Sequence, residues 1–138
     1  MAPDKAHIVE KTDLKKFTVS LRSDGIMQFT VKHETNLEVT DVKAIVNTVG
    51  KIGKGKKFPN LVVIPAGVTF DKEAREFSAR EEANVYTIAD AFVIKSLAHK
   101  LIGNFYINFD KPVRPTKLFN SQTKAVKWLK TFLKQTKH

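Results

Sequence analysis

The sequence predicts an α/β domain whose mixed central β-sheet combines an N-terminal hairpin with parallel strands and is covered by about four helices. Apolar and polar residues alternate in segments 17–21 and 27–31, which flank a Ser-Asp-Gly turn and indicate the hairpin. Segment 61–64 is continuously apolar, as is typical of a parallel strand buried on both faces, and segment 88–94 is a further apolar strand. Apolar residues at helical spacing occupy the segments between and after them, so the predicted order is ββαβαβαβα.

Capping residues and apolar stripes place the first two helices. The first helix begins near Thr40 and ends at Gly50 and Gly53. The second helix begins after Thr69 or Asp71, either of which is a suitable N-cap. Its predicted apolar residues are Ala74, Phe77, Ala83 and Val85.

The last two helices are predicted in the same way. Ser96 caps the third helix, whose expected buried stripe consists of Leu97, Leu101, Ile102, Phe105 and Phe109. A loop bracketed by prolines and a short strand at 116–119 follow. Asn120 or Ser121 then caps the final helix, whose apolar residues are Ala125, Trp128, Leu129, Phe132 and Leu133.

A chain of 138 residues fits one domain. Residues 1–14 are polar and show no pattern, so we expect a flexible N-terminal segment followed by a single domain at 15–138. The predicted strand at 17–21 would then lie at an edge of the sheet. Such an edge either pairs with a second copy, which gives a homodimer, or is shielded by the N-terminal segment.

The composition excludes several classes of protein. The chain has no cysteine, which excludes a disulfide framework, thiolate zinc sites and a cysteine nucleophile. No apolar run reaches the roughly 18 to 20 residues that cross a bilayer, so an integral membrane protein is not expected. The first residues contain no apolar secretion signal, and the expected location is the cytoplasm.

The net charge of +10 is concentrated toward the C-terminus. From Lys111 onward the chain holds eight Lys or Arg and no Asp or Glu. The final helix carries a basic patch composed of Lys124, Lys127, Lys130 and Lys134. Such a surface either keeps the protein soluble or attracts nucleic acid or another anionic surface.

No arrangement typical of an enzyme or of a metal site is found in the sequence. The four histidines are far apart, and no serine lies in a nucleophile elbow. The glycines between residues 50 and 55 precede a strand and lack the Ser or Thr of a phosphate-binding loop. We therefore expect no catalytic residues, no metal and no cofactor.

One group of polar residues is a candidate ligand or partner site. It consists of Arg75, Asn104, Lys111 and Arg114. If these residues converge, Arg75 together with Arg114 or Lys111 could hold an anion or a partner carboxylate. In the structural alternative, Arg75 pairs with Glu81 or Glu82, and Asn104 holds the proline-bracketed loop.

Three segments resemble a known group of proteins. They are residues 73–83, residues 101–106 and residues 111–119 with Ala125 and Trp128-Leu129 beyond. These segments resemble those of small, mostly uncharacterised bacterial STAS/SEC14-like proteins, which are similar to anti-sigma-factor antagonists. The resemblance extends over roughly residues 15 to 133.

The resemblance implies a non-catalytic regulatory module that binds a protein partner. STAS proteins that switch partners carry a phosphorylatable Ser in an Asp-Ser pair, which this chain lacks; Thr69 is the candidate phosphoacceptor near that position. The SEC14-like side of the resemblance implies an alternative, a small-ligand or lipid-binding module. That alternative predicts an internal apolar cavity on the order of a few hundred Å³. Nucleic-acid or anionic-surface binding through the last helix is a further alternative.

Overall fold

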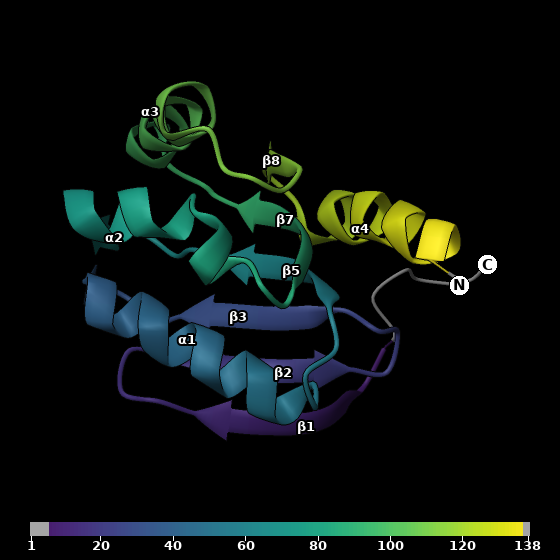
Figure 1. Ribbon diagram of the computed structural model, residues 1–138. Helices are drawn as coiled ribbons and strands as arrows, with labels where there is room; N and C mark the ends of the chain where they lie inside the picture. Colours follow the sequence, from purple (N-terminus) through teal and green to yellow (C-terminus); the bar gives the residue numbers. More distant parts are fainter. Residues whose placement is uncertain (1–5, 137–138) are drawn as a thin grey trace.

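Six strands form the central sheet of the computed structural model, which describes residues 6–136, with side chains up to residue 133 (Figure 1). Their spatial order is β1-β2-β3-β5-β7-β8. The first three strands are antiparallel and the others join the sheet in parallel. The bounds are β1 Ile8–Asp13, β2 Phe17–Arg22, β3 Met27–Val31, β5 Phe58–Val63, β7 Thr87–Val93 and β8 Thr116–Phe119. The mixed sheet agrees with the sequence prediction.

The hairpin of β2 and β3 forms where the alternating pattern predicted it. Val19 pairs with Phe29, and both side chains are buried. Gly25 closes the turn with a φ of 83°, a conformation that glycine adopts without a steric penalty.

The N-terminal segment is more ordered than the sequence suggested. Residues 8–13, expected to belong to a flexible segment, form β1, which pairs antiparallel with β2. Its side chains are mostly exposed, which explains why no hydrophobic pattern marked it. Of the two expected outcomes for the edge of β2, shielding by the N-terminal segment is therefore the one observed. Residues 1–5 lie outside the described part of the chain.

Helices cover both faces of the sheet (Figure 1). On one face lie α1 (Val39–Ile52), α2 (Lys72–Ser78) and α3 (Leu97–Phe105), which a π-helical turn (Tyr106–Asp110) extends. On the other face lies α4 (Gln122–Thr136). Side chains of β5 and β7 alternate between the two faces: Leu61, Ala89 and Ala91 pack with α4, whereas Asn60 and Asp90 face the other three helices.

The second helix is shorter than predicted. It begins after Asp71, one of the two expected caps, but ends at Ser78 and is followed by a 3-10 turn, Glu81–Ala83. The buried Asn84 side chain donates to the carbonyls of Ser78 and Arg80, at 2.8 and 2.6 Å, and so satisfies the end of the helix. Two short strands, β4 (Asn36–Leu37) and β6 (Thr69–Phe70), form a small parallel pair beside it that the sequence did not indicate.

The buried stripe predicted for the third helix is largely wrong. Ser96 caps the helix as expected, yet Leu97, Leu101 and Phe109 are 72%, 63% and 72% exposed, and Phe105 is 40% exposed. Of the predicted stripe, Ile102 faces the interior, together with His99, Gly103 and Tyr106, which were not predicted to do so. Gly103 lies against the Leu118 side chain, so its lack of a side chain allows α3 to approach β8 closely. We name Leu97, Leu101, Phe105 and Phe109 the outer stripe of α3.

The final helix packs as its periodicity predicted. Ala125, Val126 and Leu129 are fully buried in a core with Ile26 and Leu61. Trp128 packs against Phe119 and Phe132, with ring centroids 5.7 and 4.9 Å away. The tryptophan is therefore part of the core on the α4 face.

Candidate functional site

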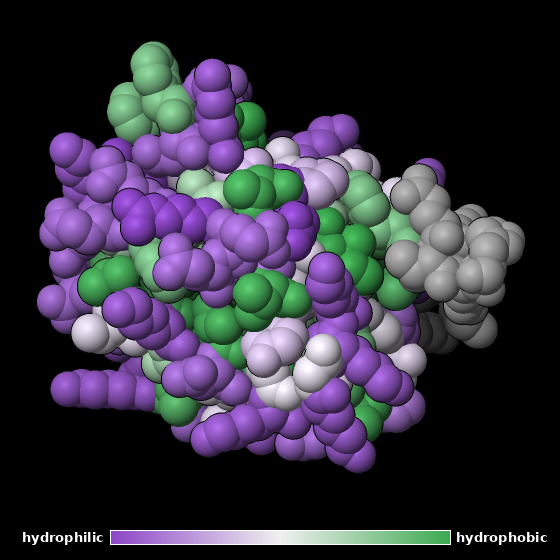
Figure 2. Space-filling view, viewed as in Figure 1, coloured by the Kyte–Doolittle hydropathy of each residue, from purple (hydrophilic) through white to green (hydrophobic). Residues whose placement is uncertain are grey.

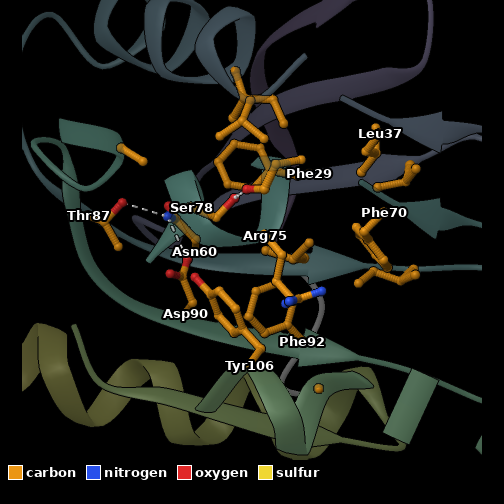
Figure 3. A pocket seen from close by; sticks show the side chains of 18 of the residues that line it. Phe29, Leu37, Asn60, Phe70, Arg75, Ser78, Thr87, Asp90, Phe92 and Tyr106 are labelled. Atoms are coloured by element: carbon orange, nitrogen blue, oxygen red, sulfur yellow. Dashed lines mark hydrogen bonds between the residues drawn. The ribbon is translucent and has the colours of Figure 1, made fainter. Parts of the chain in front are cut away.

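A cavity of about 170 Å³ lies between the sheet and the layer of α1, α2 and α3 (Figure 3). Most of its wall is apolar, with residues from the sheet, from α1 and from the interior face of α3. Its apolar lining includes Phe29, Val46, Val62, Phe70, Phe92 and Ile102. Figure 2, viewed as Figure 1, shows apolar side chains at the surface between α1 and α2. The cavity is therefore a partly open, mainly apolar chamber.

A polar cluster interrupts this apolar wall on β5 and β7. Asn60 is 4% exposed, and its side-chain nitrogen donates to Thr87 Oγ1 at 3.1 Å and to Asp90 Oδ1 at 2.9 Å (Figure 3). Both hydrogen bonds link neighbouring parallel strands. The cluster brings a carboxyl group, an amide and a hydroxyl to one wall of the cavity.

Asp90 is a buried carboxylic acid in the wall of the cavity. Burial raises its pKa from 3.8 to about 6, and the hydrogen bond from Asn60 offsets only part of that rise. No cation pairs with Asp90 among the residues that the structure describes. The carboxyl group can therefore change its charge close to neutral pH.

Tyr106 extends from the π-helical turn toward Asp90 (Figure 3). Its ring packs edge-on against Phe92, with centroids 6.0 Å apart, and the residue is 7% exposed. Burial, followed by the negative charges of Asp90 and Asp110, raises the pKa of the phenol above its usual value. Tyr106 therefore stays a neutral hydroxyl at any physiological pH.

His99 lines another part of the cavity wall. Its Nε2 lies 2.8 Å from the carbonyl oxygen of Val68, which can only accept a hydrogen bond. Nε2 therefore carries the proton in the neutral ring, and Nδ1 is left as an acceptor. The ring packs edge-on against Phe70 at 6.2 Å between centroids.

The residues with described side chains contain two buried side-chain polar atoms without a hydrogen-bond partner, Asn60 Oδ1 and His99 Nδ1. Both belong to residues that line the cavity, and both are acceptors. An unsatisfied buried polar atom costs about 1 to 3 kcal/mol. The cavity therefore offers its strongest polar interactions to a molecule that donates hydrogen bonds.

Arg75 is the one residue of the sequence-predicted site that lines this cavity. Its Nε donates to Asp110 at 2.6 Å, and its guanidinium lies 4.8 Å from the centre of the Phe105 ring. The two charged side chains are only 15% and 9% exposed. This pair joins α2 to the π-helical turn, and it differs from the expected pairing of Arg75 with Glu81 or Glu82.

The other three residues of the predicted site lie elsewhere. Arg114 pairs with Glu81 at 2.6 Å and donates to the Thr87 carbonyl at 3.0 Å. Asn104 is exposed and lines a separate groove beside β8, whereas Lys111 is exposed at the end of the π-helical turn with a φ of 51°. Each arginine thus has its own carboxylate, and the four residues do not line one cavity.

The remaining predicted residues are on the surface. Thr69 is exposed in β6, and its hydroxyl donates to Asn36 Oδ1 at 2.7 Å; its phosphorylation stays a prediction. In the basic patch, Lys124 and Lys127 are exposed, and Lys130 lies 3.8 Å from Asp24. The side chain of Lys134 lies outside the described part of the chain.

Sequence reasoning missed the polar cluster of Asn60, Thr87 and Asp90. One signal was present, because Asp90 is an acidic residue within segment 88–94, which was predicted to be an apolar strand. Within the described residues, no group of three or more His, Cys, Asp or Glu could hold a metal ion. No helix among them is both long enough and apolar enough to cross a membrane.

A family model described as a domain of unknown function, DUF7793, matches residues 19–133. The chain belongs to the DUF7793 family. No curated protein matches the chain. A crystal structure of a protein with unknown function from Arthrobacter sp. FB24 is similar at 20% identity and a TM-score of 0.31, over 81% of this chain and 97% of the other. A likeness of that size bears on neither the function nor the site.

Replacement of Asp90 by Asn should make the protein more stable at neutral pH. Asp90 ionises near its ordinary pKa of 3.8 in the unfolded chain and near 6 in the folded domain. The free energy of unfolding of the unmodified chain therefore falls as the pH rises between these values. This pKa difference corresponds to about 3 kcal/mol. Urea unfolding of Asp90→Asn and the unmodified chain should agree near pH 4 and diverge by up to that amount above about pH 7.

Asp13 provides the matched control, because its pKa is lowered by the hydrogen bond from Thr18 and then by Lys11. Relative to the unmodified chain, Asp13→Asn should therefore become less stable as the pH rises, which is the opposite sign to Asp90→Asn. A difference between Asp90→Asn and the unmodified chain that does not change with pH would show that Asp90 is not held in an apolar environment.

Replacement of Asp110 by Ala should destabilise the domain by about 2 to 3 kcal/mol, because the largely buried guanidinium of Arg75 then loses its counter-charge. The double variant Arg75→Met with Asp110→Leu should lose less, since no unpaired charge remains. Denaturant unfolding gives the free energy of unfolding of the unmodified chain, of Asp110→Ala and of the double variant. Glu81→Ala is the control: Glu81 is 61% exposed in its pair with Arg114, and its loss should cost less than about 1 kcal/mol.

Proposed function

We propose that this domain is a non-catalytic module that binds a small, mainly apolar molecule carrying a hydrogen-bond donor. The observation that carries the proposal is the apolar cavity with unpartnered acceptors on two of its lining residues, Asn60 and His99. Binding sites for small molecules are typically apolar with a few polar groups that orient the ligand. A phenol, an indole or a similar compound has this combination of properties.

The volume limits the size of the ligand. A dry apolar cavity of roughly 150 Å³ in another protein accepts benzene. A cavity of about 170 Å³ therefore suits a molecule with about six to ten non-hydrogen atoms. The sequence suggested a module that binds either a small ligand or a lipid. The cavity volume supports the small ligand, because a lipid chain with its headgroup is considerably larger.

A binding role accounts better than catalysis for the groups around the cavity. The Ser78 hydroxyl donates to the Ala74 carbonyl at 2.7 Å, and the Thr87 hydroxyl accepts from Asn60, so neither is paired with a base. Nucleophilic catalysis needs a hydroxyl or thiol activated by such a base. Asp90 then serves as an acceptor for the ligand, and one that strengthens when it ionises.

The regulatory role implied by the STAS resemblance is compatible with ligand binding. Helix α3 with its π-helical turn lines the cavity with His99 and Tyr106 and presents the outer stripe to solvent. A ligand that changes the position of α3 would alter this exposed apolar surface, and large exposed apolar surfaces commonly contact other proteins. The proposal is thus a small-molecule sensor that reports occupancy to a protein partner.

Phenol and indole should bind to the full chain with dissociation constants in the range of about 10 µM to 1 mM, given the affinity that ligands of this size reach. Benzene, which cannot donate, should bind about threefold to tenfold more weakly than phenol. Two-dimensional NMR titration measures the affinities, and the shifted resonances should include those of Asn60, Asp90 and His99.

Ala74 and Ala98 offer a matched pair of variants for this experiment. Ala74 is 1% exposed and lines the cavity, so Ala74→Leu should fill part of the space and abolish phenol binding. Ala98 is exposed on α3, and Ala98→Leu should leave binding unchanged. Thermal unfolding confirms that both variants fold. Equal binding by Ala74→Leu and Ala98→Leu would place the ligand outside the cavity and overturn the proposal.

A further inference from the structure

Strand β8 leaves one edge of the sheet without a neighbour. In the six-stranded sheet formed by the described residues, β8 is the last strand and pairs only with β7. The carbonyls of Pro115 and Phe119 accept hydrogen bonds from β7-side amides at 2.9 Å. Because alternate residues of a strand point their backbone groups to opposite sides, those of Thr116 and Leu118 point to the free edge. They form a template for one more strand.

A groove of about 690 Å³ runs along this edge, and it shares only Ile94 and Leu118 with the lining of the cavity described above. The residues of β8 line it, together with the end of β7, α3 and the first turn of α4. Leu118 lies against Gly103 of α3, whereas Phe119 packs on Trp128 of α4. The groove therefore has the strand edge along its length and one helix on each side.

Positive charge surrounds the groove on both sides. Lys95 and Lys100 belong to the α3 side, whereas Lys117, on the same face of β8 as Phe119, and Lys124 belong to the α4 side. All four lysines are exposed, and no Asp or Glu is among the described residues that line the groove. Its other lining residues include the apolar Ile94, Leu97, Ile107, Leu118 and Phe119.

We propose that this groove binds an extended, acidic segment of a partner protein, which adds a strand to the sheet at β8. Strand addition supplies main-chain hydrogen bonds to Thr116 and Leu118, and alternate side chains of the partner supply specificity. Carboxylates of the partner meet the four lysines, and its apolar side chains contact the apolar residues of the groove. Leu97 belongs to both the groove and the outer stripe of α3, which extends the apolar contact surface.

Charge and backbone geometry favour this occupant over two others. A second copy paired through its own β8 would bring the same lysines together, and like charges on adjacent strands are destabilising. An anionic bilayer would match the lysines but could not extend the strand ladder, so the backbone groups of Thr116 and Leu118 would stay without strand partners. An acidic peptide satisfies both the charges and the backbone.

The probe is a fluorescein-labelled ten-residue peptide, Glu-Glu-Val-Val-Glu-Glu-Val-Val-Glu-Glu, with blocked ends, whose carboxylates point to both faces of an added strand. Fluorescence anisotropy with the full chain at about 50 mM salt should give a dissociation constant below about 100 µM, and binding should weaken severalfold at about 300 mM because salt screens exposed charges. The double variant Lys117→Glu with Lys124→Glu should bind at least tenfold more weakly. Lys51→Glu with Lys56→Glu makes the same change of charge at exposed positions outside the groove and should bind like the unmodified chain.

Backbone N-methylation tests strand addition directly. Two versions of the peptide carry N-methyl groups on alternate amides, one version on the odd and one on the even positions. Only the set of amides that faces β8 should matter, so one version should lose binding at least tenfold and the other should bind like the parent. Equal effects of both versions would overturn strand addition.

Three other results would overturn the proposal. They are the absence of peptide binding at 50 mM salt, binding of vesicles with 30% phosphatidylserine in place of the peptide, and a concentration-dependent dimer that Lys117→Glu with Lys124→Glu alters. Ala74→Leu, which fills the cavity, should bind the peptide normally. The peptide proposal and the small-ligand proposal can therefore fail independently.

Discussion

Strands β5 and β7 are buried on both faces, and the arrangement of the helices follows from the need to cover them. On one face the small side chains of Ala89 and Ala91 allow α4 to pack closely, with Leu129 fully buried. On the other face Asn60 and Asp90 line the cavity, and residues of α1, α2 and α3 form the rest of its wall. The cavity lies on that second face, where the polar cluster of Asn60, Thr87 and Asp90 interrupts an otherwise mainly apolar wall.

Helix α3 connects the two candidate binding regions. Its interior residues, His99 and Gly103, are part of the cavity wall, and Leu97 and Lys100 on its other side line the groove beside β8. The buried pair of Arg75 and Asp110 joins the end of this helical segment to α2. A helix held by few contacts on one side and exposed on the other is suited to transmit occupancy of a cavity to a surface.

The electrostatic character differs between the two regions. The cavity contains a carboxyl group of raised pKa and acceptor atoms without partners, so it favours neutral donors. The groove is rimmed by exposed lysines and favours anions. Because exposed charges are screened by salt and buried groups are not, the two kinds of binding should respond differently to ionic strength and to pH.

The sequence by itself determined the hairpin of β2 and β3, the strands β5, β7 and β8, the packing face of α4 and the mixed sheet, because periodicity and turn residues report local geometry and burial. Only the tertiary structure decided that residues 8–13 pair with β2 as strand β1, and where the cavity lies. The outer stripe of α3 is the clearest case: its apolar spacing indicated burial, but Gly103 and the bond of His99 to Val68 turned the opposite face inward. Likewise Asn60, Thr87 and Asp90 form a cluster only because parallel pairing brings together residues 27 to 30 positions apart, a relation that no local pattern contains.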